Sequence, residues 1–165
     1  MTDADRDRLL QKLEETFVGI PRPECTKRVA RALDDEWVPS AERVAELQRL
    51  DHEEQWQDLK PEEIVAFSDV LYWMSPDGFR FYFPAFLRCS IENWHRMHDR
   101  VQLETMEVIG RQPSVADGLT AKEALISAEI LTELSVDSRG DHYWAGPSIQ
   151  ILENRAKVAA CNEQR

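Results

Sequence analysis

The segment 72–94 concentrates aromatic side chains. It holds eight of the fourteen Phe, Tyr and Trp residues of the chain. Because aromatic side chains bury large apolar areas, we expect the hydrophobic core to form around this segment. Residues 79–83 alternate between Phe and a polar-tipped side chain, and this period of two predicts a short aromatic strand or extended turn. Arg80 and Tyr82 would then face away from the phenylalanines, and Pro84 would end the strand.

Elsewhere the apolar residues recur every three or four positions, which is typical of amphipathic helices. In residues 3–17, for example, Leu9, Leu13 and Phe17 share one helical face. The predicted helices span residues 3–17, 25–37, 40–50, 61–74, 85–109, 120–134 and 148–160. The sequence therefore predicts a mainly α protein, a single-domain bundle of six or seven helices over residues 1–165, with the aromatic strand or turn between the fourth and fifth.

The residues Ser-Pro-Asp-Gly-Phe-Arg-Phe-Tyr-Phe-Pro-Ala-Phe at positions 75–86 form the most distinctive motif. This stretch resembles the signature of an uncharacterised family of small bacterial proteins, classed as a domain of unknown function. The family pattern is Ser-Pro-(Asp/Glu)-Gly-Phe-Arg-(Phe/Tyr)-Tyr-(Leu/Phe)-Pro-Ala-(Phe/Tyr), placed between two helices. The resemblance implies a cytosolic bacterial protein, and it implies no activity, ligand or catalytic residue. Residues 137–165 match the family least.

The chain is acidic along its whole length. It has 20 Lys and Arg against 31 Asp and Glu, a net charge of −11, and the regions 1–60, 61–110 and 111–165 are each negative. Nucleic acids and anionic membranes are bound through Lys and Arg, so we expect neither as a partner. A basic protein partner is compatible with this charge, because a negative field speeds such an encounter. The alternative is that the acidity only maintains solubility.

The sequence also suggests a compartment. The three cysteines, Cys25, Cys89 and Cys161, are an odd number without Cys-x-x-Cys spacing, which favours reduced thiols. The acidic N-terminal residues do not resemble a secretory signal. The longest apolar run, residues 81–87, is far shorter than the roughly 20 residues of a membrane helix. We therefore expect a cytoplasmic protein, and the sequence leaves its oligomeric state open.

Four residues form a candidate site for a small ligand or a reaction: Arg80, Tyr82, His95 and His98. A guanidinium and a phenol on one face of a strand could together bind a carboxylate or another ligand. The alternative is that Arg80 and Tyr82 only stabilise the fold, because buried polar groups normally form hydrogen bonds within the protein. In that case Tyr82 would donate to a backbone carbonyl and Arg80 would pair with a nearby acid such as Asp77.

Metal binding and catalysis have little support in the sequence. Among Cys89, His95, His98 and Asp99, only the two histidines have a good ligand spacing, whereas a site needs three or four ligands. The chain has no G-x-S-x-G motif, P-loop or G-x-G-x-x-G motif. We therefore predict no metal, no cofactor and no catalytic residue.

The leading hypothesis is a non-enzymatic protein-binding or interaction module. One form of it is an immunity-type protein that neutralises a basic partner, by analogy with size and charge alone. Aromatic side chains contribute strongly to interfaces, so the candidate interface residues are Trp37, Trp56, Tyr143 and Trp144. The alternatives are the ligand-binding protein or enzyme described above and a subunit that self-associates through its aromatic patch.

Overall fold

The computed structural model describes residues 1–36, 38–95, 100–136 and 145–163. This part of the chain is helical and contains no strand, so the prediction of a mainly α fold is confirmed. The α-helices are α1 (Asp3–Thr16), α2 (Lys27–Asp35), α3 (Ala41–Leu50), α4 (Pro61–Ala66), α5 (Pro76–Glu92), α6 (Arg100–Arg111), α7 (Ala121–Val136) and α8 (Ala145–Glu163). Short 3-10 helices are η1 (Trp56–Asp58), η2 (Val70–Trp73) and η3 (Pro113–Gly118).

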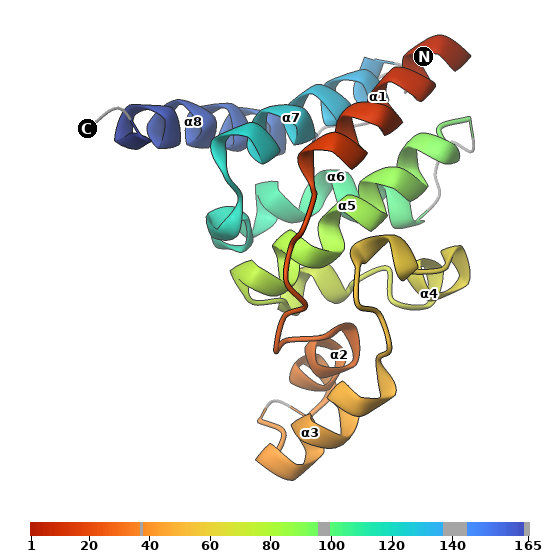
Figure 1. Ribbon diagram of the computed structural model, residues 1–165, viewed down its shortest axis with the longest axis vertical. Coiled ribbons are helices and arrows are strands. Elements are labelled where there is room, and N and C mark those ends of the chain that lie inside the picture. The colour runs from red at the N-terminus through yellow and green to blue at the C-terminus, as the bar shows by residue number, and fades with distance from the viewer. Residues whose placement is uncertain (37, 96–99, 137–144, 164–165) are drawn as a thin grey trace.

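The helices are layered around α5 (Figure 1). The helices α1, α7 and α8 lie at one end of the molecule, α5 and α6 in the middle, and α2 and α3 at the opposite end. One hydrophobic core extends from Leu9 in α1 to Ala156 in α8. A small second cluster of Val29, Ala32 and Leu47 joins α2 to α3.

The predicted strand over residues 79–83 is wrong, because this segment lies inside α5. The helix begins where Ser75 accepts a hydrogen bond from the backbone N–H of Gly78 at 3.2 Å, with Pro76 at the first helical position. Twelve of the 17 residues of α5 are buried, because α1, α4, α6 and α7 surround it. A helix that is buried on all sides needs no polar face. The alternation of Phe with polar-tipped side chains in residues 79–83 therefore does not distinguish a strand from a helix.

Pro84 does not end the element either, since α5 continues to Glu92. A proline inside a helix removes one backbone hydrogen bond and costs about 3 kcal/mol. The surrounding packing offsets that cost: Phe79 stacks on Phe83 with ring centroids 4.4 Å apart, and both side chains are fully buried. Tertiary burial therefore outweighs local helix propensity here.

The predicted helix over residues 85–109 is in fact divided between two helices. The first, α5, ends at Asn93, whose backbone N–H donates to the carbonyl of Cys89 at 3.0 Å and whose side-chain amide donates to it at 2.9 Å. The second, α6, begins at Arg100. The apolar spacing continues across the break and so gave no sign of it. The predicted helix over residues 61–74 is likewise divided, between α4 and η2.

Two glycines allow the N-terminus of α5 to approach its neighbours closely. A Cβ atom on Gly78 would lie 2.8 Å from the carbonyl oxygen of Cys25. A Cβ atom on Gly118 would lie 2.6 Å from the carbonyl oxygen of Pro76. Both contacts are with backbone, which cannot rotate away, so the absence of a side chain is required at these positions.

We expect Gly78→Ala to lower the free energy of unfolding by about 1–3 kcal/mol, because the backbone must shift to admit the methyl group. The measurement is urea unfolding followed by circular dichroism. Gly146→Ala is the matched control, because nothing lies within 4 Å of the added Cβ atom in α8. The control is expected to be neutral or to stabilise by up to about 1 kcal/mol. Equal effects of the two substitutions would contradict the close approach.

Candidate functional site

A buried lysine is the centre of the most unusual cluster in the structure. The Nζ atom of Lys27 lies 2.8 Å from Oδ1 of Asp51 and donates a hydrogen bond to Oε1 of Glu53. The side chains of these three residues are only 2%, 0% and 4% exposed. The more accessible Glu63 is 3.3 Å from the same ammonium. The guanidinium of Arg28 supplies a second positive charge, with its Nε atom 3.0 Å from Oδ1 of Asp51. Charges this deeply buried are costly unless they are paired, and both buried carboxylates have a cationic partner here.

The chain brings these residues together through helix ends. Lys27 is the first residue of α2, and Asp51 follows the last residue of α3. The Oδ2 atom of Asp51 accepts the backbone N–H of Arg28 at 3.1 Å. Thr26, the residue that precedes α2, makes no capping hydrogen bond with its side chain. Asp51 therefore caps α2 from a distant position in the sequence, and the positive end of that helix favours its charge.

Tyr82 of α5 completes the cluster. Its hydroxyl donates a hydrogen bond to Oε1 of Glu53 at 3.2 Å, and its ring is fully buried. We call Lys27, Asp51, Glu53 and Tyr82 the buried charge network. It connects α2, the segment after α3 and the central helix α5.

Protonation within this network is set by its surroundings. Burial alone would lower the pKa of Lys27, but hydrogen bonds with Asp51 and Glu53 outweigh it, so the pKa is raised. Burial, reinforced by the Glu53 carboxylate, raises the pKa of Tyr82 well above its usual value. At neutral pH the lysine is thus a charged donor and the tyrosine a neutral donor, and neither has the protonation state of a nucleophile or general base.

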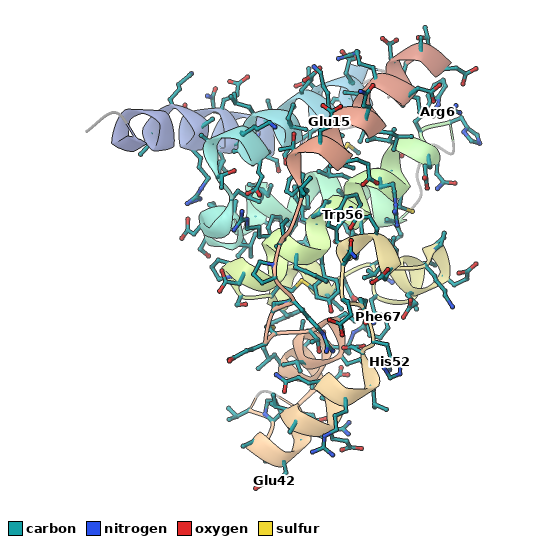
Figure 2. All side chains as sticks on the ribbon, in the orientation of Figure 1. Arg6, Glu15, Glu42, His52, Trp56 and Phe67 are labelled. Carbon is teal, nitrogen blue, oxygen red and sulfur yellow. The ribbon has the colours of Figure 1, made fainter. Side chains whose placement is uncertain are left out.

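An open pocket of about 320 Å³ lies beside the network. Its lining residues are Leu50, His52, Glu53, Asp58, Lys60 and Glu63, and we call it the acidic pocket. The hydrogen bonds that Glu53 accepts fall on Oε1, and those that Asp58 accepts from the backbone fall on Oδ2. The Oε2 atom of Glu53 and the Oδ1 atom of Asp58 accept none from the residues placed in the structure. Figure 2 shows His52 on the outside of this region.

Arg80 and Tyr82 do not form an open site together. The Nε and Nη2 atoms of Arg80 donate to the carboxylate of Glu123 at 2.9–3.1 Å. Glu123 also accepts the backbone N–H of Thr120 at 2.8 Å and so belongs to the start of α7. The expected internal pairing is present with different partners: Glu123 replaces Asp77 for Arg80, and Glu53 replaces a backbone carbonyl for Tyr82.

His95 makes no contact with Arg80 or Tyr82 among the interactions that the structure describes. His95 is exposed just after α5 and lies edge-on to Trp94, with ring centroids 6.2 Å apart. His98, like Asp99, lies outside the described residues. The described pockets do not include Arg80, Tyr82 or His95 in their linings. Across the ranges that the structure places, no group of three or more His, Cys, Asp or Glu could hold a metal ion.

Of the four candidate interface aromatics, only Trp56 lies within the described part. It is 2% exposed, its indole N–H donates to the carbonyl of Phe17 at 2.7 Å, and the Arg88 guanidinium lies over its ring. The prediction of Trp56 as an interface residue is therefore wrong, because the ring completes the core (Figure 2). Trp37, Tyr143 and Trp144 lie outside the described residues.

No pattern in the sequence indicates the buried charge network. Glu53 stands in an acidic run that reads as a solvated surface, and Lys27 precedes Arg28 in a basic pair. Their burial depends on contacts between residues more than 20 positions apart. A periodic pattern within one element cannot report such contacts.

Residues 5–117 match the family of unknown function DUF6714, and the chain belongs to that family. The expectation of an uncharacterised domain family is thereby confirmed. The matched region contains the buried charge network and the acidic pocket, and it ends before α7. No curated protein and no solved structure matches the chain. Among the helices described, none is both long and apolar enough to cross a lipid bilayer.

We expect Lys27→Met to lower the free energy of unfolding by about 3–5 kcal/mol, because it leaves Glu53 as an uncompensated buried carboxylate and leaves Asp51 with only its ion pair to Arg28. Urea unfolding provides the measurement. Lys12→Met is the matched control, since Lys12 pairs with Glu129 at 2.8 Å on a half-exposed surface. Such a surface pair contributes at most about 1 kcal/mol. A loss no larger at Lys27 than at Lys12 would contradict the network.

The raised pKa values of Lys27 and Tyr82 predict a loss of stability at alkaline pH. The folded protein retains both protons where the unfolded chain begins to release them, near pH 10. Stability is therefore complete below about pH 10 and falls above it by up to about 1.4 kcal/mol per pH unit for each proton. Urea unfolding from pH 8 to pH 11 measures this slope. Tyr82→Phe should make it shallower, and an unchanged slope in that variant would refute the contribution of Tyr82.

Proposed function

We propose that this protein is a non-enzymatic interaction module whose acidic pocket receives a cationic side chain of a basic partner protein. The observation that carries the proposal is the pocket itself: a hollow of about 320 Å³ beside a buried charge network. A Lys or Arg side chain would reach the Oε2 atom of Glu53 and the Oδ1 atom of Asp58. Charge-assisted hydrogen bonds of this kind are among the strongest in interfaces.

Charge supports a basic partner. The pocket is lined by three carboxylates, those of Glu53, Asp58 and Glu63, and by the ammonium of Lys60. The buried ammonium of Lys27 pairs with Glu53 and Glu63, so three negative charges face two positive ones and the balance stays negative. The exposed Glu54 and Glu62 are chain neighbours of two of these residues. The chain as a whole carries a net charge of −11. A field of one sign around a pocket steers an oppositely charged partner and suppresses wrong ones.

Rigidity supports binding rather than chemistry. Lys27 and Tyr82 both donate hydrogen bonds to Oε1 of Glu53. These bonds order the carboxylate before a partner binds, so binding costs little side-chain entropy. Because the same two residues are locked as proton donors, they offer neither a nucleophile nor a base. This combination is that of a recognition site, such as an immunity-type protein uses to neutralise a basic toxin.

The remaining expectations agree with this function. We infer a bacterial, cytoplasmic protein in which residues 1–165 act as one domain, without nucleic acid or membrane as a partner. The acidity along the whole chain supports the exclusion of nucleic acids and anionic membranes as partners.

Binding of a fluorescent oligoarginine peptide, followed by anisotropy, tests the acidic pocket. We expect the double variant E54K/E62K to weaken binding by about tenfold, equivalent to about 1.4 kcal/mol. Lys60→Glu should strengthen binding, because it removes the only ammonium among the lining residues of the pocket.

The control double variant is E15K/E42K, which changes the net charge equally at exposed sites on α1 and α3 (Figure 2). It should change the affinity by less than about threefold. Equal weakening by the two double variants would show that the peptide senses only net charge, and the proposal would fail.

A further inference from the structure

The outer side of the helical hairpin formed by α7 and α8 contains a second, largely apolar hollow. It measures about 390 Å³ and is lined by Leu125, Glu153, Ala156 and Lys157. The Leu125 side chain is 55% exposed, and Val158, next to Lys157 in α8, is 63% exposed. Large apolar side chains exposed beside an apolar hollow mark a surface that gains stability when it is covered.

The inner side of this hairpin is already occupied. The hydroxyl of Ser148 in α8 accepts the backbone N–H of Gly110 at 2.8 Å and donates to the carbonyl of Met106 at 2.6 Å. Arg155 pairs with Asp117 at 2.6 Å. The C-terminal end of α8 extends to the edge of the molecule, away from α5 and α6 (Figure 1). The hollow is therefore on a fixed surface that another molecule can reach.

The charges beside the hollow are self-complementary. Glu153 and Lys157 are four residues apart on α8, and neither forms an ion pair with any residue that the structure places. If two α8 helices pack antiparallel about a two-fold axis level with residue 155, midway between the two, Glu153 of each copy lies opposite Lys157 of the other. A two-fold interface uses the same patch on both subunits and therefore needs opposite charges within that patch.

The shape is also self-complementary. Leu125 both lines the hollow and is more than half exposed, so it can enter the hollow of a second copy while the other copy's Leu125 enters the hollow of the first. We propose that two copies of this chain form a symmetric dimer through Leu125, Glu153 and Lys157 on the α7–α8 hairpin, around the hollow that the buried Ala156 helps to line. This surface is separate from the acidic pocket, and it lies outside the region matched to the family.

Sedimentation velocity over a concentration series measures the dissociation constant of the dimer. The test compares the wild type with variants in which the charges at positions 153 and 157 are reversed singly or together. The wild type is expected to dimerise. The single variants E153K and K157E place like charges opposite each other and should each raise the dissociation constant at least about tenfold. The double variant E153K/K157E restores opposite charges and should return the constant to within about threefold of the wild type.

Leu125→Glu should abolish the dimer, while Val65→Glu, at an equally exposed valine (57%) in α4, should leave it intact. Circular dichroism and thermal unfolding confirm that each variant is folded. A monomeric wild type, a dimer that survives Leu125→Glu, or a failure of the double variant to recover would each overturn the proposal. None of these results bears on the oligoarginine experiment, which uses other residues and another measurement.

Discussion

The ion pairs of the Lys27 ammonium with Asp51 and Glu53 are the interaction on which the arrangement of α2 and α3 against α5 depends. Removing a lysine and two carboxylates from water is unfavourable by several kcal/mol for each group, and only close pairing offsets it. The pairing fixes three segments at once: the start of α2, the end of α3 and, through Tyr82, the middle of α5. Geometry this specific gives the acidic pocket a rigid wall.

The sequence predicted the helical class because amphipathic spacing is a local property, and most of the helices are half-buried. It failed at α5 because the central helix is buried on every side. There Phe79, Phe81 and Tyr82 are all in the core, so polarity no longer distinguishes a period of two from a period of 3.6. The break between α5 and α6 was missed because the apolar pattern continues across it.

The candidate site was harder to predict than the fold. Arg80 and Tyr82 stand out in the sequence as polar side chains in an apolar segment, and in the structure each has an internal partner. Their partners, Glu123 and Glu53, are 43 and 29 positions away, and nothing near them in the sequence indicates the pairing. Trp56 shows the same limit, since an isolated tryptophan in a polar stretch reads equally well as a surface residue or as a core residue.

The ion pair between Arg80 and Glu123 joins the part of the chain matched to the family with the part that follows it. Glu123 also closes the first turn of α7 through Thr120. A fragment cut after residue 117 would therefore lose both the counter-ion of Arg80 and the helix that covers one side of α5. The end of the region matched to the family therefore falls between an arginine and the carboxylate that pairs with it.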